Sequence, residues 1–134
     1  MKLKLALLAM GFGLLTGVAP MSAHHSFAGT YLEDAPPMTI EGELKAFLVR
    51  NPHSFVQVEV KDKSGATTRW AVEWGAGGQL GRQGVTRDTL KAGDHVIVVG
   101  NPGRTAEDHR LRMVNITRPA ANGQPEFKWG GTFD

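Results

Sequence analysis

Alternating apolar and polar positions in the first half of the chain predict a series of short strands. Residues 38–49, 54–60 and 67–74 each place apolar side chains on one face and polar ones on the other, as half-buried strands do. The turn at 61–65 joins the last two strands as a hairpin. Gly42 interrupts the first strand, and we expect it to mark a bend where a barrel coils.

The second half of the chain changes from a helical pattern back to strands. A short helix or helical turns are expected over residues 80–90, with Thr86 as its N-cap. Two further strands follow at 95–100 and 109–117. Three strands, one short helix and two strands, in that order, are typical of an OB-type barrel. The sequence therefore predicts an all-β fold: a small antiparallel OB-like barrel of about five strands, with one short helix between the third and fourth.

The first 23 residues have the features of a secretory signal peptide. Lys2 and Lys4 give a positive start, residues 5–18 are almost entirely apolar, and Ala23 is the small residue that signal peptidase requires before its cut. The apolar stretch is too short for a comfortable membrane span. We expect cleavage after Ala23, a periplasmic or secreted protein, and no membrane insertion once the leader is removed.

Composition limits what the exported chain can bind. The leader holds two of the 15 Lys and Arg residues and none of the 13 Asp and Glu residues, so the rest of the chain is formally neutral. That balance does not favour nucleic acid as a partner. There is no Cys, so a metal site must use nitrogen and oxygen ligands, with Met as the only soft option. The expected organisation is a leader at 1–23, an N-terminal segment at 24–37, the barrel at 38–118 and a tail at 119–134. Within the tail, Phe127 and Trp129 could dock on the barrel.

Five ordered motifs carry a family resemblance. They are His24-His25-Ser26-Phe27, Asn51-Pro52-His53, Trp70-Ala71-Val72-Glu73, Leu80-x-Arg82-x-Gly84 and Leu90-Lys91-Ala92-Gly93-Asp94. Together they resemble a family of small exported bacterial proteins known as domain of unknown function 6152. The resemblance covers nearly all of the chain after the leader. It implies export and a shared β fold, and it supplies no reaction.

A histidine pair stands at the expected mature N-terminus. If the cut falls after Ala23, His24 offers a free α-amine and an imidazole, which together close a chelate ring on a metal. A second imidazole, from His25 or His53, would complete a three-nitrogen set similar to the histidine brace of copper proteins, which suits Cu(II). The sequence thus predicts a mononuclear copper site at these three histidines. Against it, a histidine pair at a chain end is often only a solvated polar pair.

Four more residues are expected to support this site or contact a bound molecule. Glu73 could supply an oxygen ligand or accept the hydrogen bond that fixes an imidazole tautomer, although Arg69 or Arg82 is available to pair with it instead. Trp70 lies on the opposite face of the same strand and is expected mainly in the core. Asn51 belongs to the turn that carries the third candidate histidine.

Two other functions stay open. One is a metal-free interaction module that binds a partner protein, a saccharide or a small molecule through a cleft lined by Phe55, Trp74 or Trp129. The other is a small hydrolase or isomerase in which Glu73 and His53 act as acid and base, which requires the two side chains to lie within about 3 Å or to share a water. No Cys is present and no Ser lies in an activating motif, so an enzyme is the less favoured class.

Overall fold

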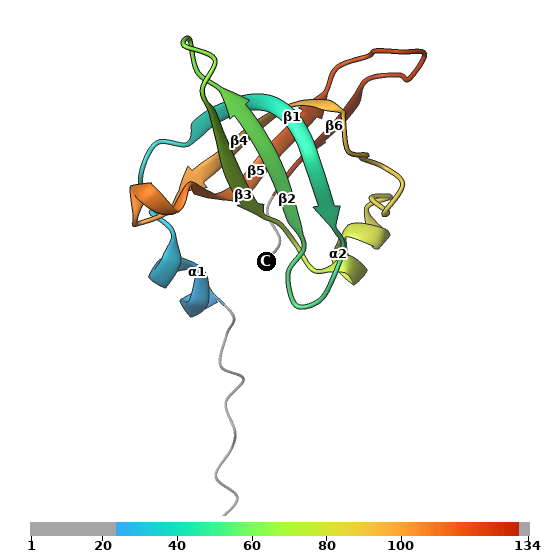
Figure 1. Cartoon of the computed structure of the whole chain (residues 1–134). Helices are drawn as coiled ribbons and strands as arrows, with labels where there is room; N and C mark the ends of the chain where they lie inside the picture. The colour runs from blue at the N-terminus through green and yellow to red at the C-terminus, as the bar shows by residue number, and fades with distance from the viewer. Residues whose placement is uncertain (1–23, 132–134) are drawn as a thin grey trace, which may run out of the picture.

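Strands make up most of the regular secondary structure in residues 24–131, the part of the chain that the computed structural model describes (Figure 1). The elements are α1 (His24–Thr30), β1 (Met38–Leu48), β2 (Phe55–Lys61), β3 (Thr67–Glu73), α2 (Gly77–Arg82), β4 (His95–Pro102), the 3-10 helix η1 (Ala106–Asp108), β5 (Arg110–Arg118) and β6 (Phe127–Gly130). Residues 1–23, where the sequence predicts a leader, lie outside the described residues.

The strands close into a barrel. They are ordered β3-β2-β1-β4-β5-β6, and β3 also pairs with β5, which closes the first five strands on themselves. This closing pair is parallel, whereas the other pairs are antiparallel. The predicted all-β, OB-like barrel with a short helix between its third and fourth strands is confirmed. The parallel closing pair is the one departure from an antiparallel barrel.

Gly42 lies where β1 passes from one partner strand to the other. Residues 38–43 pair with β4, and residues 43–48 pair with β2. The pairing with β2 contains a register shift between Leu44 and Ala46. A Cβ at Gly42 would overlap the backbone carbonyl of Glu59 on β2. The bend expected at this glycine is therefore present, because a close backbone approach at this point needs a residue without a side chain.

The helix between β3 and β4 begins earlier than the sequence pattern indicates. α2 starts after Ala76, whose backbone N–H donates to the side chain of Gln79, and Gly84 follows it with a φ of 78°. A glycine in this left-handed conformation is a common way for a helix to end. The bounds expected for the helix, 80–90, are therefore wrong, and the second part of that range is a separate turn. Thr86 does cap this turn, because its Oγ1 accepts from the Asp88 N–H at 3.4 Å.

Residues beyond β5 add a sixth strand rather than only a loose tail. β6 pairs with the second half of β5, and Trp129 is buried against Trp74 with ring centroids 4.9 Å apart. Its indole N–H donates to Gln83 at 2.5 Å. Phe127 packs on the edge of the same core. Within residues 24–131 no helix has the length and apolar character needed to cross a membrane.

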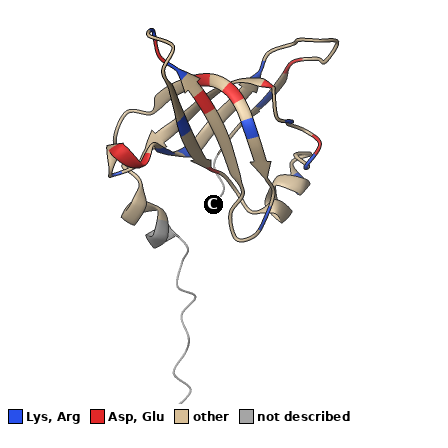
Figure 2. Ribbon diagram, in the orientation of Figure 1, with Lys and Arg blue, Asp and Glu red and all other residues tan. Residues whose placement is uncertain are grey.

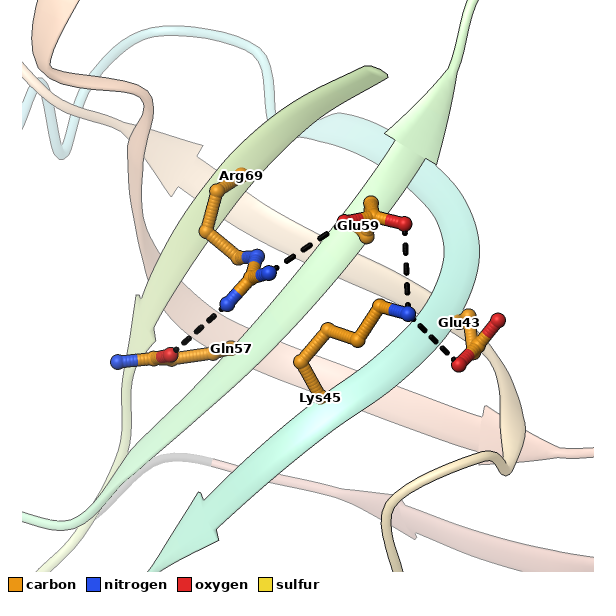
Figure 3. A network of polar contacts seen from close by, with 5 residues as sticks. All are labelled: Glu43, Lys45, Gln57, Glu59 and Arg69. Atoms are coloured by element: carbon orange, nitrogen blue, oxygen red, sulfur yellow. Dashed lines mark hydrogen bonds and ion pairs between the residues drawn. The ribbon is translucent and has the colours of Figure 1, made fainter.

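Charged side chains of both signs are interspersed along the ribbons (Figure 2). On β1, β2 and β3 four of these charged residues and one glutamine form a connected set, which we call the outer network: Glu43, Lys45, Gln57, Glu59 and Arg69 (Figure 3). Lys45 lies 2.8 Å from Glu43 and 3.3 Å from Glu59, and Arg69 lies 3.3 Å from Glu59. These strands therefore carry paired charges on a solvated surface.

Candidate functional site

The turn before β2 is held by Ser54, and this fixes His53 beside the end of β3. The buried Ser54 hydroxyl donates to the carbonyl of Arg50 at 3.2 Å and accepts from the Arg50 N–H at 3.1 Å. The Ser54 backbone also exchanges hydrogen bonds with Trp74 and Gly75. The peptide bond between Asn51 and Pro52, inside this turn, is cis. His53 is thus carried by a turn fastened at both ends.

Glu73 is the acidic residue at the centre of the site. It ends β3, where the barrel closes, and its side chain is only 9% exposed. One carboxylate oxygen, Oε1, lies 2.6 Å from His53 Nδ1. The other, Oε2, accepts from the Tyr31 hydroxyl at 2.5 Å and from Arg110 Nη2 at 3.4 Å. We call these four residues, Tyr31, His53, Glu73 and Arg110, the Glu73 cluster.

Tyr31 connects the N-terminal helix to this cluster. It is fully buried, its backbone N–H donates to the Phe27 carbonyl, and it forms a β-bridge with Gly103. Burial, reinforced by the hydrogen bond to Glu73, raises the pKa of the Tyr31 phenol well above its usual range, while Arg110 opposes this shift weakly. The phenol therefore remains a protonated donor to the carboxylate.

Helix α1 is docked on the barrel close to His53. The Phe27 ring lies over the His53 ring, with centroids 4.8 Å apart, and the Arg112 guanidinium lies 4.0 Å from the Phe27 centroid. Arg104 donates from Nε to the Ala28 carbonyl at 2.8 Å. Figure 1 shows α1 on the side of the barrel where η1 lies, away from α2. The start of α1 is thus held within one helical turn of a residue that touches His53.

The structure brings together His53 and Glu73 from the predicted set and leaves three other predicted residues apart from them. Trp70 is half-buried against the core and packs edge-on against His109 at 5.2 Å. Asn51 is exposed in the turn, and Arg82 is exposed on α2. The side chains of His24 and His25 lie outside the described residues, although α1 begins at His24.

The arginine beside Glu73 is Arg110, whereas the sequence pointed to Arg69 or Arg82. Arg69 instead pairs with Glu59 on the outer face of the barrel. Sequence reasoning also missed Tyr31. A signal for Arg110 did exist, because the closing strands of an OB-type barrel place the start of the fifth strand beside the end of the third.

The aromatic cleft that an interaction module would use is not supported by the burial of these residues. Trp74 and Trp129 are 3% and 8% exposed and belong to the core cluster. Phe55 is half-buried beneath Arg50, whose guanidinium lies 5.0 Å from its ring centroid. These rings fill the barrel or its surface contacts, so they do not form an open aromatic surface.

The contact between His53 and Glu73 determines what the imidazole can do. When Nδ1–H donates to the carboxylate, the lone pair of the neutral ring is on Nε2, ready to bind a metal or accept a proton. Among the residues with described side chains, no group of three or more His, Asp or Glu residues is arranged to hold a metal ion. Further His, Asp or Glu donors to a metal held by His53 would therefore have to include side chains outside this description, such as those of His24 and His25.

Comparison with known protein families shows which family the chain belongs to. A model described as a family of unknown function (DUF6152) matches residues 13–112, which is most of the chain. The chain belongs to this family. The match extends to Arg112 on β5, so it includes all four residues of the Glu73 cluster. No curated protein matches the chain. Membership of DUF6152 supplies no activity, and the function must be argued from the site.

Proposed function

We propose that this DUF6152 protein is exported, loses its leader after Ala23 and binds one copper ion at the new N-terminus. In this proposal His24 supplies its α-amine and its imidazole, and His53 supplies Nε2 as the third nitrogen. Glu73 contacts His53 Nδ1, on the side of the ring away from the metal, and so fixes the orientation of the imidazole. Three nitrogens in this arrangement suit Cu(II), and a carboxylate behind a ligating imidazole is the usual way for a protein to orient it.

The 2.6 Å contact between Glu73 Oε1 and His53 Nδ1 carries this proposal. It leaves Nε2 as the nitrogen with the free lone pair. The packing of α1 adds to it, because Phe27 contacts the His53 ring and follows His24 by three residues, about one helical turn. His53 is therefore favoured over His25 as the second imidazole.

The test uses the full chain, produced with its leader and purified from the periplasm of a bacterial host. Intact mass first establishes whether the protein begins at His24. One equivalent of Cu(II) is then expected to bind in calorimetry, with nitrogen hyperfine structure in the electron paramagnetic resonance spectrum. No copper uptake by protein that begins at His24 would overturn the proposal.

Matched variants assign the donors. His24→Ala and His53→Ala are expected to abolish tight binding, whereas His25→Ala, at the adjacent position, should retain it. Acetylation of the N-terminal α-amine in the purified protein keeps both histidine side chains but removes the amine from the chelate ring, so it should also abolish tight binding. Copper uptake that is unchanged by His24→Ala contradicts this donor set. Uptake that is lost with His25→Ala but kept with His53→Ala also contradicts it.

The same contact favours a second candidate function, a small hydrolase or isomerase. The separation of 2.6 Å meets the distance required for an acid–base pair, with His53 Nε2 taking a proton from a substrate and Glu73 stabilising the imidazolium. The discriminating measurement is activity of metal-free protein on ester and ketone panels. Turnover by metal-free protein that His53→Gln abolishes and His24→Ala leaves unchanged would favour this function over copper binding.

A further inference from the structure

The two oxygens of Glu73 are divided between different partners. Oε1 faces only His53 among the contacts of this carboxylate, at 2.6 Å from Nδ1. Oε2 accepts from Tyr31 and Arg110, which come from the end of α1 and the start of β5. The two oxygens of an ionised carboxylate are equivalent, so only a partial rotation changes the contacts, and it would break both bonds to Oε2. The orientation of Glu73 toward His53 is therefore set from the Oε2 side.

Tyr31 is the stronger of the two partners on that side. Its hydroxyl lies 2.5 Å from Oε2, whereas Arg110 lies 3.4 Å away and is one-third exposed. The phenol cannot easily move, because the Tyr31 backbone is held by Phe27 on one side and by Gly103 on the other. The Arg110 guanidinium also lies 5.7 Å from the centroid of the Tyr31 ring.

We propose that Tyr31 is a positioning residue that sets the tautomer of His53 through Glu73. By holding Oε2, its phenol keeps Oε1 on the Nδ1 side of the imidazole, so that His53 carries its proton on Nδ1 and presents the lone pair of Nε2. Only the assignment of a copper ion to Nε2 rests on the proposed function. The tautomer itself is a property of the metal-free protein.

Nitrogen-15 NMR of the imidazoles in metal-free protein tests this inference. In the wild-type chain His53 is expected to show one tautomer, with a hydrogen on Nδ1 and an unprotonated Nε2. Tyr31→Phe keeps the ring but removes the donor, and it should give a mixture of the two tautomers. Phe27→Leu is the matched control: it removes a ring that touches His53 but no hydrogen bond to Glu73, so the tautomer should be unchanged.

A second perturbation covers the case in which Tyr31→Phe fails to fold. Tyr31 is the only Tyr in the sequence, so growth on fluorotyrosine labels this position alone. Fluorine makes the phenol more acidic and hardly changes the shape of the side chain. The His53 Nδ1–H resonance is therefore expected to shift. An unshifted Nδ1–H resonance in the labelled protein overturns the inference.

Copper affinity supplies the separate readout. If copper binds at Nε2, Tyr31→Phe should weaken it by about tenfold, the lower end of the range for loss of a group that orients a ligand. If the tautomer changes and the wild-type protein takes up no copper, the positioning role stands and the proposed function fails. If Tyr31→Phe leaves the single Nδ1–H tautomer intact, or if wild-type His53 is protonated on Nε2, the positioning role is wrong whatever the copper result.

Discussion

The outer network and the Glu73 cluster both pair a glutamate with an arginine, but they differ in access to water. In the outer network Glu59 and Arg69 are 25% and 51% exposed, so water can replace a partner that is lost. In the Glu73 cluster the central carboxylate is 9% exposed. A buried charge that loses its partner has no such replacement. Burial, rather than the number of contacts, therefore decides which of the two matters for stability.

The two sets also differ in how their members come together. The outer network joins neighbouring positions on adjacent strands, such as Glu59 and Arg69, which are directly opposite in the β2–β3 register. The Glu73 cluster joins four separate segments: the residue after α1, the turn before β2, the end of β3 and the start of β5. The outer network requires only strands that follow one another in the sequence. The Glu73 cluster requires the closed barrel.

Removing the central carboxylate should give the largest effect. Glu73→Leu leaves the Tyr31 hydroxyl and the Arg110 guanidinium without their acceptor, and we expect a loss of about 3 to 5 kcal/mol in the free energy of unfolding. Urea denaturation measures it. Glu59→Leu, the corresponding change in the outer network, should move the midpoint far less. Equal shifts for the two variants would remove the distinction between the two sets.

Removing the arginines should give a smaller difference in the same direction. Arg110→Ala is expected to cost about 1 kcal/mol, because its hydrogen bond to Glu73 is long and its side chain is one-third exposed. Arg69→Ala should cost less, since both partners of that ion pair are open to solvent. Chemical denaturation of the two variants side by side checks the order, and a costlier Arg69→Ala would reverse it.

Alkaline titration tests the cluster through its single phenol. Burial and the hydrogen bond to Glu73 raise the Tyr31 pKa in the folded protein, so phenolate absorption should appear only above the ordinary tyrosine value of about 10. A raised pKa means that the folded state holds its proton longer than the unfolded state. This contribution to stability is complete below the unfolded pKa and is lost as the pH rises through the folded one. An ordinary titration in folded protein would contradict the burial of this group.

The smallest effect is expected from salt on the outer network. Partial burial alone would raise the Glu59 pKa, but hydrogen bonds and ion pairs with Lys45 and Arg69 outweigh it and lower the pKa. That stabilisation is present above the unfolded pKa and is lost as the pH falls through the folded one. High salt should bring the Glu59 pKa back toward its ordinary value, as carbon-13 NMR of the carboxylate can follow. A salt-independent pKa would indicate a less solvated network than the exposed fractions imply.

Most of the barrel could be predicted from local sequence patterns. Alternation along residues 54–60 and 67–74 reflects side chains that point to opposite faces of one strand, and Gly42 marks a backbone approach that no side chain allows. The bounds of α2 could not be read in this way. Its start depends on the Gln79 side chain and its end on the conformation of Gly84, neither of which leaves a periodic signal.

The residues of the Glu73 cluster also differ in whether the sequence could indicate them. His53 and Glu73, which the sequence offered as possible partners, lie at the adjoining ends of β2 and β3, and one hairpin brings these ends together. Arg110 reaches Glu73 only through the parallel pairing of β3 with β5. Tyr31 precedes a turn-rich stretch with two prolines, a setting that gives no sign in the sequence of a buried residue. Both are long-range neighbours that periodicity cannot indicate.

The closing pair between β3 and β5 also lets us predict which contacts form first during folding. The Tyr31–Glu73 contact spans 42 residues of chain and the Arg110–Glu73 contact spans 37, whereas Arg69 and Glu59 are 10 apart. Contacts that enclose long loops carry a larger entropic cost before they form, so the hairpin is expected early and the Glu73 cluster late. Variants at Glu73 should therefore speed unfolding while leaving the refolding rate nearly unchanged. A chain caught before closure would already carry its outer charges in place, but it would not yet hold His53 in the orientation that a ligand requires.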